Sequence, residues 1–163
     1  MGSIDSILLT HAELAIALAG FASVAAVLRR PLAPVQRQRF FAILFPWLFQ
    51  ILASILSLWL AELELAGPAL WRTASALQLA LALPIAVFVL LPLRQLGARS
   101  FLVINRPITS IGYGLLAALF ALLVVNLLVS ASSFALYYAA LLTGLVTIFL
   151  AFADVVVVGH DEP

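Results

Sequence analysis

Residues 134–158 read FALYYAALLTGLVTIFLAFADVVVV, and Asp154 is the single charged residue of this stretch. A helix needs about 20 mainly apolar residues to cross the hydrocarbon core of a bilayer, so the stretch is long enough to span one. Gly159 follows it, at the place where a glycine commonly ends a helix. The sequence therefore predicts a transmembrane helix here.

Four further apolar stretches precede this one and are separated by short polar or proline-containing segments. The first ends at Arg29-Arg30-Pro31, and Gly67-Pro68 marks the turn after the second. The five predicted transmembrane helices cover residues 7–28, 40–61, 69–93, 108–129 and 134–158. No repeat of about 20–50 residues and no linker divides the chain, so we expect a single domain over residues 1–163.

The segment SASS at residues 130–133 is the least marked of the predicted boundaries. One of the two apolar stretches that it separates could lie in the membrane interface instead, which would leave four spans. Both stretches exceed the roughly 20 residues that a span requires, so the sequence favours five.

The composition agrees with an all-α integral membrane protein. Of 163 residues, 66% are hydrophobic and 9% are charged, whereas soluble domains carry about 25% charged residues. The absence of cysteine excludes disulfides, iron–sulfur clusters and thiolate metal sites. A net charge of +1 without a clustered basic face argues against nucleic acid as a partner.

The arginines predict the orientation of the chain in the membrane. Seven of the eight basic residues fall in the two segments that follow the first and third predicted helices: Arg29, Arg30, Arg37, Arg39, Arg94, Arg99 and Arg106. Cytoplasmic loops are enriched in Arg and Lys. We therefore expect the N-terminus outside and the C-terminus in the cytoplasm, with the first helix retained rather than cleaved as a signal peptide. Three tryptophans toward helix ends are expected to anchor at the interfaces: Trp47, Trp59 and Trp71.

Polar residues inside apolar helices are the candidate functional residues, because burying an ionisable group in a membrane costs about 2.5–3.5 kcal/mol. The candidates for a polar or ion pathway are Glu13, His11, Gln78, Asn126 and Asp154. Neutral polar residues gather in the predicted outer half, which suggests a polar vestibule there. In the alternative reading, Glu13 reaches the headgroups, Asp154 lies at the interface, and the neutral residues bond helix to helix.

The first predicted helix is rich in small residues, which let helix backbones approach closely. Its candidate packing residues are Ala15, Ala19, Gly20, Ala22 and Ser23. One face carries Glu13, Ala17, Gly20 and Val24, and the adjacent face carries alanines. We therefore expect this helix to be central, either within the bundle or around an oligomer axis.

Enzymatic motifs such as HExxH, a P-loop or GxSxG are absent from the sequence. His11 and His160 lie on opposite sides of the membrane in the predicted topology, so they do not form one metal site. We expect no enzyme, no metal and no cofactor.

Two resemblances follow from short motifs. Residues 12–15 (AELA), 18–22 (LAGFA) and 70–75 (LWRTAS) resemble a family of small bacterial multi-pass inner-membrane proteins. This resemblance implies a bacterial inner (cytoplasmic) membrane and carries no activity over. Residues 20–27 (GFASVAAV) are similar to the pore-lining first helix of Orai calcium channels. The glutamate that follows this segment in that family is Leu28 here, so calcium selectivity is not carried over.

Two functions are compatible with these features. The first is a homo-oligomeric ion channel or pore in which the first helix lines the axis and Glu13 attracts cations. The alternative is a non-conducting scaffold or accessory subunit that binds another membrane protein. In both, the lipid bilayer is the immediate surrounding of the chain.

Overall fold

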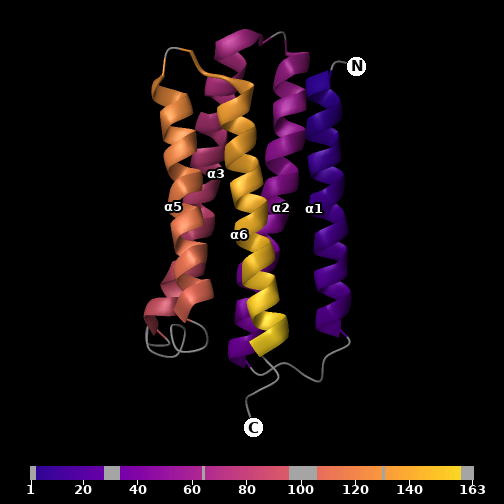
Figure 1. Ribbon diagram of the computed structural model, residues 1–163, viewed down its shortest axis with the longest axis vertical. Helices are drawn as coiled ribbons and strands as arrows, with labels where there is room; N and C mark the ends of the chain where they lie inside the picture. The colour runs from indigo at the N-terminus through magenta and orange to yellow at the C-terminus, as the bar shows by residue number, and fades with distance from the viewer. Residues whose placement is uncertain (1–2, 28–33, 64, 96–105, 130, 159–163) are drawn as a thin grey trace.

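In the computed structural model, the regular structure of the described residues consists of five α-helices (Figure 1). They are α1 (Ser3–Val27), α2 (Pro34–Glu62), α3 (Gly67–Gln95), α5 (Arg106–Leu128) and α6 (Phe134–Val158). The structure describes residues 3–27, 34–63, 65–95, 106–129 and 131–158. Within these helices, the side chains of residues 25–27, 34–44, 85–95, 106–110, 113 and 154–158 lie outside the description.

The all-helical fold and the separation of the last two helices confirm the sequence-based prediction. The predicted helix at residues 134–158 coincides with α6, while α1, α2, α3 and α5 begin before their predicted apolar stretches. A helix extends as far as its backbone bonds allow, so an apolar window underestimates its length. Pro34 opens α2, where a residue without an N–H fits. Gly67 opens α3 with a φ of 60°, a left-handed value that glycine adopts without steric cost.

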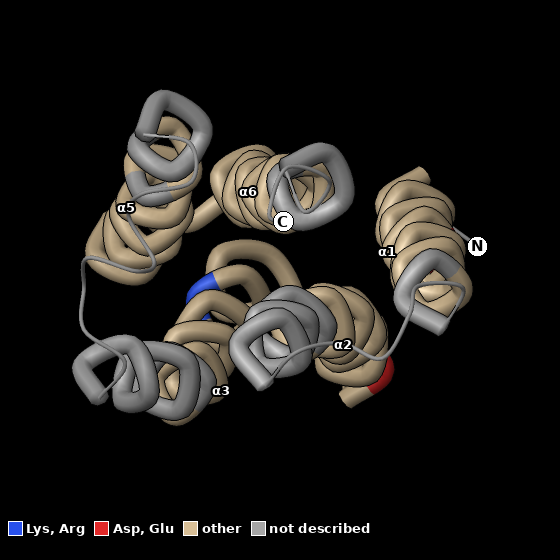
Figure 2. The backbone as a smooth tube through the Cα atoms, turned by 90° about the horizontal axis from the view of Figure 1, so that it is seen from below, with Lys and Arg blue, Asp and Glu red and all other residues tan. Residues whose placement is uncertain are grey.

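Four of the helices form a bundle, and α1 flanks it. Viewed along the bundle, α2, α3, α5 and α6 surround a common interior, and α1 lies outside against α2 and α6 (Figure 2). Successive helices alternate in direction, so α1 begins and α6 ends at opposite ends of the bundle (Figure 1). The prediction that the first helix is central within its own bundle is therefore wrong.

The interior is packed in two apolar clusters. The Trp71 cluster occupies the end of the bundle where α1 begins and contains Leu8, Ala53, Leu60, Leu70, Trp71, Ala74, Leu119, Leu123, Tyr137, Ala140 and Leu141. The Trp47 cluster lies toward the other end and contains Ala22, Trp47, Ile148 and Phe152. Trp47 and Trp71 thus pack in the core instead of anchoring at an interface, and only Trp59, at 56% exposure, remains available for that role among the three.

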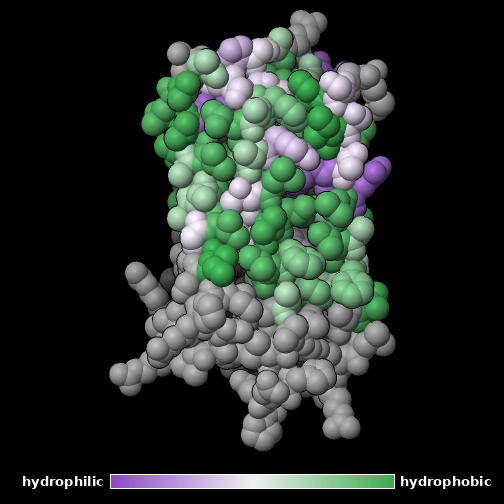
Figure 3. Space-filling model, viewed as in Figure 1, coloured by the Kyte–Doolittle hydropathy of each residue, from purple (hydrophilic) through white to green (hydrophobic). Residues whose placement is uncertain are grey.

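The outer surface of the bundle is largely apolar. Three segments in the described part are long and apolar enough to cross a membrane: Ser3–Val24, Phe45–Glu62 and Phe134–Ala153. A shorter apolar segment, Gly114–Leu128, belongs to α5. Hydrophobic side chains cover most of the described part of the face seen in Figure 3. These features are those of a membrane protein, since such a surface suits lipid better than water.

Candidate functional site

Helix α1 divides into a packed face and an open face. Ala12, Ala15 and Ala22 are buried on the side that meets the bundle. Glu13, Ala17, Gly20 and Val24, which together we call the open face of α1, are all exposed. The alanine face therefore docks α1 on its own chain, while no helix of the described part covers the open face.

The remaining predicted packing residues of α1 have smaller roles. Ala19 and Ser23 are half-buried, and the Ser23 hydroxyl donates a hydrogen bond of 2.8 Å to the Ala19 carbonyl of the same helix. A Cβ atom added at Gly20 would meet no atom within 4 Å. The expected close approach at Gly20 therefore does not occur within one chain.

Close approach occurs instead at Gly144 of α6, which the sequence analysis did not single out. A Cβ atom there would overlap the Gln50 side-chain amide of α2 and lie 2.7 Å from Cδ1 of Leu119 on α5. Gly144 is thus the position where three helices of the bundle meet most tightly among the described glycines. Its position inside an apolar helix gives no local signal for this contact.

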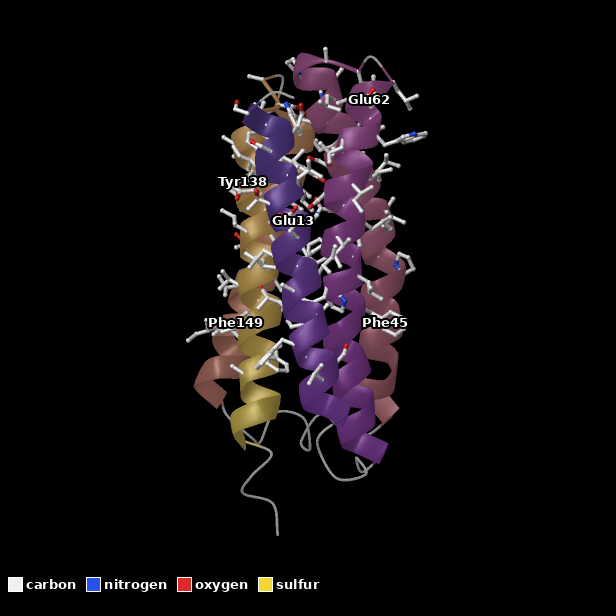
Figure 4. All side chains as sticks on the ribbon, turned by 90° about the vertical axis from the view of Figure 1, so that its right-hand side faces the viewer. Glu13, Phe45, Glu62, Tyr138 and Phe149 are labelled. Atoms are coloured by element: carbon white, nitrogen blue, oxygen red, sulfur yellow. The ribbon has the colours of Figure 1, made fainter. Side chains whose placement is uncertain are left out.

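His11 and Glu13 point in different directions from α1. Glu13 is exposed and lies on the side of α1 that faces the viewer in Figure 4. His11 is buried, and its Nδ1 lies 2.9 Å from the Ser54 hydroxyl oxygen of α2. Its ring also meets Tyr138 of α6 edge-on, with centroids 6.2 Å apart. His11 therefore ties α1 to the bundle, and it does not share a site with Glu13.

The Ser54 hydroxyl joins His11 to the backbone of α2. Its oxygen lies 2.9 Å from Nδ1 of His11 and 3.0 Å from the Gln50 carbonyl oxygen, and the tautomer of the ring decides whether Nδ1 donates or accepts. The other ring nitrogen is Nε2. That atom is buried and has no hydrogen-bond partner in the described part of the chain.

A second buried contact joins α2 to α6. The Ser57 hydroxyl donates to the Tyr137 hydroxyl at 2.7 Å, and Tyr137 in turn donates to the Ala53 carbonyl at 3.0 Å. Buried polar groups in membrane helices commonly bond across helices in this way. Tyr137 is therefore fixed by two groups of α2.

Asn126 organises the junction of α3, α5 and α6. Its Nδ2 donates to the Ser75 hydroxyl of α3 at 2.9 Å, and its Oδ1 accepts the Ser133 backbone N–H at 2.8 Å. Ser132 donates to the Asn126 carbonyl at 2.5 Å. Arg72 of α3 donates to the Val129 carbonyl at 3.1 Å, just beyond the end of α5, where a cation is favourable. The Asn126 side chain and backbone therefore join α3, the end of α5 and the segment that leads into α6.

The amides of Gln50 and Gln78 lie in the interior without a full set of partners. Each side chain is 1% exposed. Oε1 of Gln50 and both Oε1 and Nε2 of Gln78 have no partner in the described part, and the same holds for Nε1 of Trp47. Along α2, Gln50 lies between Trp47 of the Trp47 cluster and Ala53 of the Trp71 cluster.

A cavity of about 270 Å³ opens at the end of the bundle where α1 begins. Its lining comes from α1, α2 and α3: Ser3, Ile4, Asp5, Leu8, Ser57, Leu58, Ala61, Leu70 and Trp71. No group of three or more His, Cys, Asp or Glu side chains that could hold a metal occurs among the described residues. Asp154 lies in α6, but its side chain is outside the description, as are seven of the eight arginine side chains.

Comparisons with known proteins yield no relative for this chain: no protein-family model, characterised protein or solved structure matches it. The two resemblances drawn from short motifs therefore stay predictions.

Proposed function

We propose that this protein is a multi-pass protein of a bacterial inner membrane whose copies assemble through the open face of α1 into a cation-selective pore. The observation that carries the proposal is the position of Glu13. Its carboxylate is exposed on a helix whose residues Ser3–Val24 are apolar enough to cross a membrane.

A carboxylate facing lipid is unfavourable by about 2.5–3.5 kcal/mol on insertion scales. Gathering Glu13 residues from several copies around a water-filled axis removes this cost, because axial water solvates each carboxylate. A ring of negative charge in a narrow passage also concentrates cations. The Glu13 carboxylate would then account both for the assembly of copies and for the selectivity of the pore for cations.

The order of residues along the open face suits such an axis. Glu13 is followed by the small residues Ala17 and Gly20 and then by Val24, all of them exposed. A charged ring with an apolar constriction beyond it is a common arrangement in channels. The interior of each bundle is filled by the Trp47 cluster toward one end, so the proposed conduction path lies between copies.

The proposed topology has five spans, with the N-terminus outside. It is supported by the arginines that lie within helices: Arg37 and Arg39 near the start of α2, Arg94 near the end of α3 and Arg106 at the start of α5. Since the helices alternate in direction, these four positions fall at one end of the bundle (Figure 1). The positive-inside rule places that end in the cytoplasm.

The test is a conductance measurement on purified protein whose copy number has been counted. In planar bilayers with a salt gradient, the proposal expects discrete conductance and a reversal potential close to the cation equilibrium potential. A monomer without conductance would contradict it.

A second candidate is a non-conducting subunit that binds another membrane protein through α1. It is favoured by the large apolar side chains Ile16 and Phe21 beside the open face and Val24 on it, which are 54%, 64% and 58% exposed. Such side chains suit a dry contact with another helix. A chain that stays monomeric, does not conduct and pairs with a basic membrane helix would favour this function.

A further inference from the structure

Gln50 and Gln78, whose amides carry unpartnered atoms, share one layer of the bundle. Gln50 lies twelve residues before the end of α2 at Glu62, and Gln78 lies eleven residues after the start of α3 at Gly67. The two helices are antiparallel neighbours, so at about 1.5 Å per residue both glutamines lie about 17 Å from the intervening turn. Both are almost fully buried.

Gln50 reaches into the centre of that layer. Its amide nitrogen occupies the space beside Gly144 of α6, and Leu119 of α5 packs at the same point. The side chain of Gln50 therefore extends from α2 toward the two helices on the other side of the bundle. The missing Cβ of Gly144 is what leaves room for it.

The unpartnered atoms of this region include both donors and acceptors. Nε2 of Gln78 can donate, while Oε1 of Gln50 and Oε1 of Gln78 can accept. Leaving a buried polar group unpaired costs about 1–3 kcal/mol, and the hydrocarbon around a membrane bundle offers no compensation. A partner that both donates and accepts would satisfy the unpaired atoms of both glutamines.

The absence of charged side chains from the described interior indicates that this partner is neutral. Asp, Glu, Arg and Lys are absent from the buried side chains of the described part, so an ion would lack a counter-charge. A neutral molecule with donors and acceptors fits better, and buried waters typically bond about three polar groups each.

Polar side chains of α2 continue from this layer toward the end of the bundle where α1 begins. Ser54, bonded to His11, lies one turn above Gln50 on α2, and Ser57 lies one turn further. Ser57 also lines the cavity of about 270 Å³ at that end. In the opposite direction, the apolar side chains of the Trp47 cluster close the interior.

We propose that water enters the bundle from the cavity at Ser57 and binds between Gln50 and Gln78, with the Trp47 cluster as the closed end of this internal path. The proposed water path lies within a single chain, so its test does not depend on assembly through α1.

The chain has no cysteine, so single introduced thiols can report water access. Thiols react as thiolates, which form only where water reaches them. The experiment compares three single-cysteine variants of the purified full chain in detergent. We expect Ag⁺ to react with the thiols of Gln78→Cys and Gln50→Cys about tenfold faster than with the thiol of Ala74→Cys. Ala74 is the matched control because it is equally buried on α3, one turn from Gln78, inside the Trp71 cluster. Equal rates at Gln78 and Ala74 would overturn the proposal.

A measurement on the unsubstituted chain covers the case in which the glutamine variants do not fold. With ¹⁵N-labelled glutamine, the side-chain amide of Gln78 should show magnetisation transfer from water in nuclear magnetic resonance spectra. An amide without such transfer would mean that the layer is dry, and would overturn the proposal as well.

Discussion

The Nδ1 atom of His11 lies 2.9 Å from the Ser54 hydroxyl oxygen, and this hydrogen bond ties the flanking helix α1 to α2. Both side chains are almost fully buried. The bond therefore fixes the register at which the alanine face of α1 meets the bundle, and with it the direction in which Glu13 points.

Ser54→Ala removes the hydroxyl that bonds Nδ1 of His11 and leaves a buried ring nitrogen unpaired. We expect a loss of about 1–3 kcal/mol in the free energy of unfolding, measured by denaturant titration in detergent. Ser6→Ala is the control, because the Ser6 hydroxyl is exposed and bonds within α1. Adding His11→Leu to Ser54→Ala should recover part of the loss, since neither polar group then remains. Equal stability of the Ser54 and Ser6 variants would show that the bond does not hold α1.

Gly144→Leu places a branched side chain where the Gln50 amide and Leu119 already lie. Overpacking of this kind costs about 1–3 kcal/mol, and the melting temperature should fall accordingly. The control is the same substitution at a glycine of α1, Gly20→Leu. It should leave the melting temperature of the monomer unchanged, because open space surrounds Gly20. The opposite ranking of the two variants would contradict the packing described for α6.

Tyr137→Phe keeps the ring in the Trp71 cluster and removes the hydroxyl that bonds Ser57 and Ala53. Hydrogen bonds between membrane helices average about 0.6 kcal/mol and reach about 1.7 kcal/mol, so we expect a loss in that range. Tyr138→Phe is the neighbouring control, whose ring stacks on Phe134 with centroids 5.4 Å apart. If both variants lose the same stability, the Tyr137 hydroxyl has no special part in joining α2 to α6.

Glu13→Gln preserves the size of the side chain and removes its charge. If Glu13 residues line a common axis, the reversal potential in a salt gradient should shift toward zero while the number of copies stays the same. Glu62→Gln is the control, because Glu62 is an exposed carboxylate at the end of α2, away from the middle of α1 (Figure 4). An unchanged reversal potential in Glu13→Gln would exclude the carboxylate ring.

The number and order of the helices were predictable from sequence because they depend on local apolar length. The start of α6 at Phe134 was predicted because the apolar stretch begins there, directly after the segment SASS. In the structure, Ser133 caps this helix by accepting the Leu136 N–H at 3.3 Å. The helix starts were less accurate, because polar residues such as those after Pro34 extend a helix without adding to its apolar window.

The arrangement of the helices could not be predicted, because it depends on pairs of residues far apart in the chain. The small residues of α1 have two different structural roles. Alanines such as Ala15 pack against the bundle of the same chain, whereas Gly20 faces open space. Composition does not separate these roles. The bonds of Asn126 to Ser75 and of His11 to Ser54 likewise join segments that share no sequence pattern.

The central claim is that copies of this protein meet at the open face of α1, and disulfide cross-linking in membranes tests it most directly. The chain has no cysteine, so a single Gly20→Cys substitution allows only copy-to-copy bonds at that position. Leu83→Cys is the control, because Leu83 is also exposed and lies on α3, a bundle helix away from α1 (Figure 2). Under oxidation, the account predicts covalent dimers for Gly20→Cys and monomers for Leu83→Cys. Monomers for Gly20→Cys, or equal dimer yields for the two variants, would contradict it.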